Sequence, residues 1–162
     1  MGHRIGDEGG GYWIGKEAIR TIMKMLDGRE PETILSHLVL NHFQFEDYEQ
    51  LYDWVYGPNY SIHEVGKVST IVGEANHLGD PASKCILNRA VTELYCLVST
   101  AVKRADISDE PFKLLMLGGV LQNSEYINSE LIRQIKDNMA NVDIITDYDI
   151  PIDLIIQRGL NG

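Results

Sequence analysis

The sequence of 162 residues lacks the features that mark several large protein classes. Two cysteines are too few for a disulfide framework. The N-terminal stretch MGHRIGDEGG has no apolar segment of the kind found in secretory signals, and no uninterrupted apolar run approaches the roughly 20 residues of a membrane span. With 14 basic against 24 acidic residues, the formal net charge of -10 disfavours nucleic acid and anionic membranes as partners. We therefore expect a cytoplasmic protein that binds neither nucleic acid nor a membrane.

Familiar catalytic and metal-binding signatures are missing as well. The sequence contains no Walker phosphate loop, no GxGxxG fingerprint, no GxSxG elbow and no Ser-His-Asp set. Its five histidines form neither an HExxH motif nor a cluster with cysteine, so we expect no metal site. Cys85 and Cys96 are eleven residues apart, about three helical turns, which places them on one face of a helix, where we expect both in the core.

What is present is the pattern of one helix-rich α/β domain covering residues 1–162. The length suits a single domain, and 44% hydrophobic with 23% charged residues is ordinary for a globular protein. We expect Pro31 in the first turn of the second helix, Ser61 and Asp80 as N-caps, and a central, buried helix over 79–106 because its apolar positions nearly encircle the axis. Apolar spacing and breakers predict helices over 13–26, 31–43, 46–57, 61–79 and 79–106.

The C-terminal part of the sequence has a different character. A continuous apolar run over 112–120 predicts a buried strand, followed by a helix over 123–139 capped by Asn123 or Ser124. A second strand over 142–147 and a last helix over 150–160 complete a strand, helix, strand, helix order. This order predicts a parallel βαβα unit, and hence a small sheet within a helix-rich domain.

Two glycine-containing segments are candidates for binding. Gly118 and Gly119 follow the first strand and precede Asn123, so they form either a turn that admits a ligand to the backbone or an ordinary capped turn. Near the N-terminus, GDEGGG places Asp7 among glycines. This segment is either a loose tail or a loop in which the carboxylate accepts hydrogen bonds from paired hydroxyls such as those of a sugar ring.

Three strings in this order resemble the C-terminal half of the N-acetylglucosamine kinase and BadF/BadG/BcrA/BcrD ATPase family. They are GHRIGDEGGGYWIGKEAI, GEANHLGDPASK and LLMLGGVLQNSEYI. That family belongs to the actin, sugar-kinase and Hsp70 superfamily of two-domain, RNase H-like ATPases. The resemblance implies that the chain is the second RNase H-like domain of the actin-like ATPase fold without its first strands, and that the N-terminal ATPase domain is absent.

The resemblance also implies what the two segments bind. Asp7 would hold hydroxyls of an amino sugar, with Gly2 in the same loop, and ATP with Mg²⁺ would be the cofactor of the full-length protein. Serine is usual in the family where Gly10 stands. We expect Asp7 and Gly118 to line one cleft, with carbohydrate on one side and purine on the other. The residues that would face the nucleotide are Ala75, Gly118, Gly119 and Asn123.

The resemblance thus predicts a fragment of an ATP-dependent kinase, a transferase acting on N-acetylglucosamine or a related amino sugar. The family's phosphate loop and catalytic aspartate have no match here, so we expect no catalytic residue in this chain and no activity of the polypeptide alone. Two alternatives stay open. One is an ATPase activator of an acyl-CoA reductase or dehydratase, in which cysteines hold an iron–sulfur cluster. The other is a non-catalytic assembly module, for example a homodimer formed through exposed apolar surface.

Overall fold

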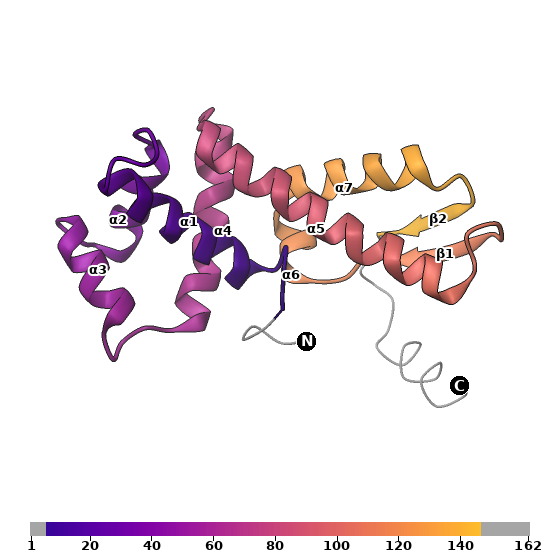
Figure 1. The fold of residues 1–162 in the computed structure, drawn as a ribbon, viewed down its shortest axis with the longest axis horizontal. Coiled ribbons are helices and arrows are strands. Elements are labelled where there is room, and N and C mark those ends of the chain that lie inside the picture. The colour runs from indigo at the N-terminus through magenta and orange to yellow at the C-terminus, as the bar shows by residue number, and fades with distance from the viewer. Residues whose placement is uncertain (1–5, 147–162) are drawn as a thin grey trace.

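Helices dominate the computed structural model, which describes residues 6–146. The predicted helix over 150–160 lies outside this range. Five helices come first and a small α/β unit follows, as Figure 1 shows. The elements are α1 (Gly11–Leu26), α2 (Ile34–Phe43), α3 (Tyr48–Tyr56), α4 (Ile62–His77), α5 (Pro81–Ala105), β1 (Phe112–Leu115), α6 (Gly119–Asn123), α7 (Glu125–Asn138) and β2 (Val142–Ile145).

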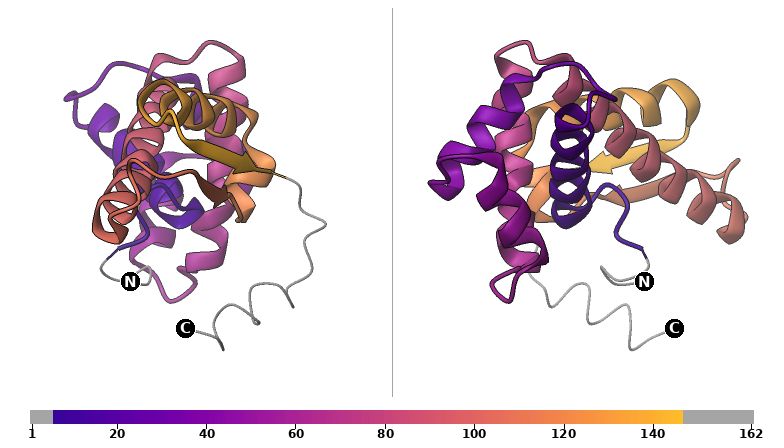
Figure 2. Two further views of the ribbon diagram at one scale, coloured as in Figure 1. Left: turned by 90° about the vertical axis from the view of Figure 1, so that its right-hand side faces the viewer. Right: turned by 60° about the vertical axis from the view of Figure 1, so that its left-hand side comes forward.

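The helices α1 to α4 gather at one end of the molecule and the strands lie at the other, with α5 running between them (Figure 1). Strands β1 and β2 pair in parallel, with Phe112 opposite Val142 and Leu115 opposite Ile145. Helix α7 packs against both β2 and α5, so it covers one face of the sheet (Figure 2). The parallel strand–helix–strand unit is therefore confirmed, although β1 is shorter than predicted and half-buried rather than buried.

Side-chain caps fix where several helices begin. Ser61 accepts a hydrogen bond from the Glu64 amide and Asp80 from the Ser83 amide, which confirms both predicted N-caps. Of the two candidates for the cap of α7, Ser124 is the one observed, and it accepts from the Ile127 amide. A side-chain oxygen at each of these positions satisfies an amide that the first helical turn leaves without a partner.

The second helix begins later than its sequence predicts, so the placement of Pro31 in its first turn is wrong. Helix α2 begins at Ile34 and its N-cap is Thr33. The reason is tertiary, because the carboxylate of Asp80 reaches across to this helix start. It accepts hydrogen bonds from the Thr33 hydroxyl at 2.6 Å and from the Ile34 amide at 3.1 Å. Asp80 thus caps α5 and secures the start of α2 at the same time.

Helix α5 is buried mainly in its N-terminal half, with Val102 the buried residue near its other end, which corrects the expectation of a central, buried helix. Its first turns contribute Ile86, Leu87, Ala90 and Val91 to the core, whereas Leu97 is 57% exposed. Within residues 6–146, α5 is long and apolar enough to cross a membrane by length and composition alone, as are the core helices of some soluble proteins. The apolar residues of α5 therefore do not have packing partners on every side of the helix.

Cys85 and Cys96 are both exposed, so the prediction that they belong to the core is wrong. Their spacing does place them on one face of α5, but that face is the outer one. Exposed thiols can reach a ligand at the surface, but their separation along the helix, about 16 Å at 1.5 Å per residue, argues against both holding one iron–sulfur cluster.

Both thiols are expected to react rapidly with 5,5′-dithiobis(2-nitrobenzoic acid) in the native protein, because the reagent reaches exposed sulfur without unfolding. Stopped-flow absorbance should show two thiols per chain, at rates close to those in denaturant. The single variants Cys85→Ser and Cys96→Ser, each retaining one thiol, assign the two phases. A thiol that reacts only after urea is added would contradict its exposure.

Candidate functional site

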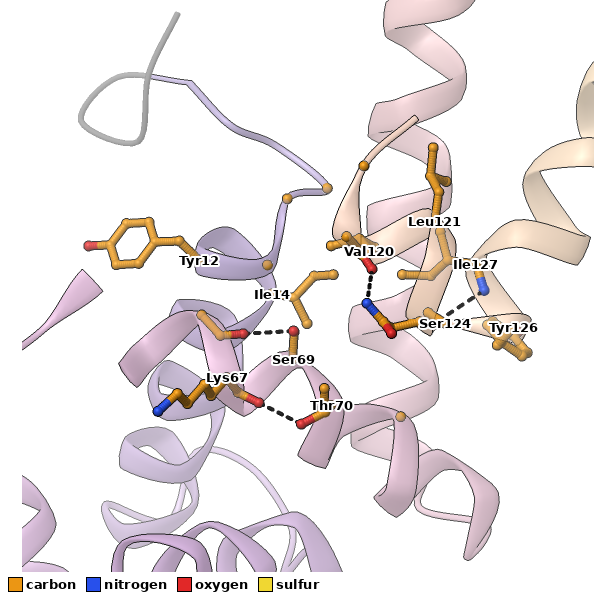
Figure 3. Close-up of a pocket in the computed structure, with 18 of the residues that line it drawn as sticks. Tyr12, Ile14, Lys67, Ser69, Thr70, Val120, Leu121, Ser124, Tyr126 and Ile127 are labelled. Atoms are coloured by element: carbon orange, nitrogen blue, oxygen red, sulfur yellow. Dashed lines mark hydrogen bonds between the residues drawn. The ribbon is translucent and has the colours of Figure 1, made fainter. Parts of the chain in front are cut away.

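A cavity of about 980 Å³ lies where three parts of the chain meet. The N-terminal loop and the start of α1 form one wall, one side of α4 forms a second, and the β1–α6–α7 connection forms the third. Figure 3 shows one lining residue from each of these parts, namely Tyr12 from α1, Lys67 from α4 and Val120 from α6. The cavity therefore brings together segments more than 100 residues apart in the sequence, from Asp7 to Gly118.

The N-terminal loop is packed onto α5, which decides against a loose tail for its described residues. Gly9 is buried with φ +80°, and a Cβ there would lie 2.6 Å from Leu94 Cγ and 3.0 Å from the Ala90 carbonyl oxygen. Asp7 has φ +85°, and its carbonyl accepts a hydrogen bond from the Gly10 amide at 2.8 Å. Glycine is required at position 9 because both the conformation and the close contact exclude a side chain.

The carboxylate of Asp7 stands at the cavity without a partner among the described residues. Asp7 is exposed and lines the cavity, and within residues 6–146 its side chain has neither a hydrogen bond nor an ion pair. A non-glycine residue at positive φ is uncommon, although aspartate tolerates it better than most residues. An unpaired carboxylate held in such a conformation can accept hydrogen bonds from a ligand.

Small residues of α4 form the floor of the cavity. Gly66, Ser69, Thr70 and Gly73 recur at helical spacing and all line it. The hydroxyls of Ser69 and Thr70 donate to backbone carbonyls of their own helix at 2.7 Å (Figure 3). A Cβ placed on Gly73 would meet no atom within 4 Å, so the backbone there faces open space.

The turn after β1 forms the far wall. Gly118 has φ +133°, and a Cβ placed on it would also meet nothing within 4 Å. Gly119 begins the short helix α6, which the Asn123 side chain closes by donating to the Gly119 carbonyl at 2.7 Å. Asn123 therefore stabilises the turn itself, and the long helix that follows is capped by Ser124.

Charged and aromatic side chains stand near the α1 and α4 end of the cavity. Lys67 Nζ lies 2.8 Å from Glu64 Oε1, and the hydrogen bond from Lys67 holds the pKa of the Glu64 carboxyl below its usual value. The hydroxyls of Tyr12 and Tyr60 lie 2.8 Å apart. Burial, together with this contact, raises the pKa of Tyr60, so its phenol stays neutral at physiological pH.

The structure places the predicted site residues as follows. Asp7, Gly118, Gly119 and Asn123 line the same cavity. Ala75 is fully buried in the core, and its neighbours Glu74 and Asn76 line the cavity instead. Gly2 lies outside the described residues. What these residues bind stays a prediction.

Of the residues that α4 contributes to the cavity, sequence reasoning missed Gly66, Ser69, Thr70 and Lys67. A signal for the floor was present, since small residues at i, i+3, i+4 and i+7 share one helix face. That face became part of a cavity only when the β1–α6–α7 turn was placed opposite it.

Within residues 6–146, no three histidine, cysteine, aspartate or glutamate side chains gather in a way that could hold a metal ion. The described residues therefore do not provide a protein cage for Mg²⁺.

The comparisons with known proteins agree with one another. The sequence model of the BadF/BadG/BcrA/BcrD ATPase family matches residues 1–156. The chain is 33% identical over 145 residues to the N-acetylmuramic acid/N-acetylglucosamine kinase of Clostridium acetobutylicum, covering 90% of this chain and 47% of that protein. It is 31% identical over 146 residues to the N-acetyl-D-glucosamine kinase of Dictyostelium discoideum, covering 89% and 46%.

A solved structure shares the fold. It is a crystal structure assigned to the N-acetylglucosamine kinases, from Chromobacterium violaceum, with a TM-score of 0.66 at 22% identity. The match covers 88% of this chain and 45% of that one. The chain thus spans about half the length of the curated relatives it matches, and the predicted helix-rich α/β fold class is confirmed.

Proposed function

The chain belongs to the BadF/BadG/BcrA/BcrD ATPase family, and from this we propose that it forms one half of an ATP-dependent amino-sugar kinase. The relatives named above are kinases of N-acetylglucosamine or N-acetylmuramic acid, which supports the substrate class. The observation that carries the proposal is that one cavity joins Asp7 to the Gly118 turn. Phosphoryl transfer needs donor and acceptor side by side, and a shared cavity provides that.

At the sugar end, Asp7 is proposed to accept hydrogen bonds from two hydroxyls of the amino sugar. Its carboxylate is exposed, lines the cavity, and has no partner within residues 6–146. Hydrogen bonds to a charged acceptor contribute about 1.5–3 kcal/mol, roughly twice a neutral one. Removing the charge of this side chain should therefore measurably weaken binding of the sugar.

At the nucleotide end, the adenosine of ATP is proposed to lie between the Gly118–Gly119 turn and the floor of α4. The residues fit such a group, because Gly73 and Gly118 both face open space where a flat ring can approach the backbone. ATP would supply the phosphoryl group. This chain would bind and orient the nucleoside and the sugar, and a partner domain carrying the phosphate loop and catalytic base would complete the site. A kinase of this kind would work in the cytoplasm, where ATP is available.

Isothermal titration of this chain with ADP and with N-acetylglucosamine tests the proposal directly. Asp7→Asn keeps the shape of the side chain and removes its charge, so it should raise the Kd for the sugar by about 10-fold or more and leave that for ADP within about twofold. Asp109→Asn is the matched control, because Asp109 is exposed in a turn away from the cavity. Absence of heat from both ligands at millimolar concentration would refute the proposed function.

A further inference from the structure

We propose that the outer face of α3 docks a segment of another protein that carries two arginines about one helical turn apart. This α3 face consists of the side chains of Glu49, Tyr52, Asp53 and Tyr56, all of which are exposed. Helix α3 lies at the end of the molecule opposite the strands (Figure 1). The cavity is lined by other parts of the chain, so docking at α3 does not depend on the proposed kinase function.

Helix α3 packs against the rest of the protein through its opposite side. Leu51 is fully buried, and the ring of Trp54 lies 4.5 Å from that of Phe43 between centroids. The four residues of the α3 face follow one another at i, i+3, i+4 and i+7, the spacing of a single helix face. Tyr52 is 53% exposed and Tyr56 is 74% exposed. Two large rings exposed side by side form a surface that a binding partner can cover.

The sequence of the α3 face repeats a carboxylate followed by a tyrosine. In EQLYDWVY, Glu49 precedes Tyr52 by three residues and Asp53 precedes Tyr56 by three residues. Side chains three residues apart on a helix are neighbours, so each carboxylate stands beside one ring. The two pairs are four residues apart, which is about 6 Å along the axis at 1.5 Å per residue. The two rings lie 4.6 Å apart. The face therefore provides two similar binding positions one turn apart.

The carboxylates of the α3 face are not neutralised by the protein itself. Residues 30–66 contain seven acidic residues and no lysine or arginine. Within residues 6–146, the side chains of Glu49 and Asp53 have neither a hydrogen bond nor an ion pair. On α7, by contrast, Glu130 and Asp137 both pair with Arg133. The charge of the α3 face is therefore available to a cation from outside the chain.

The protein shows elsewhere which cation a ring and a carboxylate hold together. On α1, Trp13 and Glu17 are one turn apart, and Arg89 of α5 contacts both. Its guanidinium carbon lies 5.3 Å from the centre of the Trp13 ring, and its Nη1 donates to Glu17 Oε2 at 2.8 Å. A guanidinium can do both because its flat face stacks on the ring while its N–H groups meet the carboxylate. Arginine is therefore the expected partner of each carboxylate–tyrosine pair on α3.

The spacing and the charge together identify the segment that fits. Two arginines four residues apart on a helix, or two apart on a strand, lie about 6–7 Å from each other along the chain axis. A second copy of the α3 face would bring carboxylates against carboxylates, and nucleic acid would bring phosphates against them. A basic segment of another protein matches both the charge and the spacing.

Two alanine-based helical peptides test the proposal on the 162-residue chain. They are identical except that one carries arginine and the other lysine at two positions four residues apart. Fluorescence anisotropy of the labelled peptides should show saturable binding of the arginine peptide. The lysine peptide should bind at least about fivefold more weakly, because its compact ammonium cannot stack as a plane. Equal affinities, or no saturable binding of the arginine peptide at several millimolar protein, would overturn the inference.

A double variant of the two carboxylates measures their contribution. Glu49→Gln combined with Asp53→Asn should raise the Kd of the arginine peptide by about 10-fold or more. Asp109→Asn combined with Glu110→Gln is the matched control, because it removes the same two charges from an exposed turn that lies away from α3. The control should change the Kd by less than about twofold. Equal losses in both variants would show that only net charge attracts the peptide, and would overturn the inference.

A double variant of the two rings measures the stacking. Tyr52→Leu combined with Tyr56→Leu should weaken the arginine peptide by about 10-fold and abolish its advantage over the lysine peptide. Both side chains are exposed, so the Tm should stay close to that of the wild type. An unchanged preference for arginine would overturn the inference. So would a dimer of the wild-type chain in sedimentation that this variant dissociates, because a second copy would then be the occupant.

Discussion

Replacing Gly15 by alanine is expected to lower the free energy of unfolding by about 3 kcal/mol, at the upper end of the range for overpacking. A Cβ at this position would overlap the carbonyl oxygen of Val65 and lie 2.9 Å from its carbonyl carbon. The obstacle is backbone, so no side-chain rotation relieves it. Helices α1 and α4 would have to separate, and these helices carry two of the walls of the cavity.

Urea denaturation followed by far-ultraviolet circular dichroism gives the loss directly, and the Tm should fall by about 6–12 °C for a protein of this size. Gly73→Ala is the control. Gly73 also lies within a helix, but a Cβ there meets nothing, so alanine should leave stability unchanged or raise it by up to about 1 kcal/mol. If the two substitutions had similar effects, the close crossing of α1 and α4 would be wrong.

Asp80→Ala is expected to cost about 3 kcal/mol, because one side chain serves two helices. Asp80 is 2% exposed, and its carboxylate accepts from the Thr33 hydroxyl, the Ile34 amide and the Ser83 amide. Its removal takes away the cap of α5, worth about 1 kcal/mol, and leaves buried donors at the start of α2 without an acceptor.

Asp47→Ala is the matched comparison for this prediction. Asp47 caps α3 but is exposed at its helix start and accepts from the Gln50 amide at 2.9 Å. It should therefore cost only the ordinary amount for a cap, about 1 kcal/mol. Equal losses for the two aspartates, measured by urea denaturation at pH 7, would show that the link from Asp80 to α2 contributes nothing.

The same carboxylate gives stability a dependence on pH. Burial alone would raise the pKa of Asp80, but hydrogen bonds from Thr33, Ser83 and Ile34 outweigh burial and lower it. A carboxyl whose pKa is lower in the folded protein contributes its full stability above its unfolded value, near 3.9, and loses it as the pH falls below that value. Asp80→Asn should therefore show a smaller loss of stability between pH 5 and about pH 3 than the wild type. Parallel pH profiles would contradict this assignment.

Some features followed from the sequence because they depend on neighbours along the chain. Ser61 and Asp80 cap their helices as predicted, since the amides they serve lie three residues away. The parallel pairing of β1 with β2 followed from the order of strand, helix and strand. Local hydrogen bonds and connection lengths are sufficient to decide such features.

Other features depended on partners far away in the sequence. The spacing of Cys85 and Cys96 placed them on one face of α5, but only the packing of the other helices decides which face is buried. From the sequence, Asp80 was expected only to cap α5. In the folded protein it also accepts a hydrogen bond from Thr33, 47 residues away, and α2 begins at Ile34 beside this contact.

The sequence by itself determined the helix-rich α/β class, most of the caps, and the two glycine-containing segments in which Asp7 and Gly118 stand. Only the tertiary structure decided that these segments line one cavity and that the small residues of α4 form its floor. The physical reason is that caps and periodicity arise within a few residues, whereas a cavity exists only where distant segments are packed against one another.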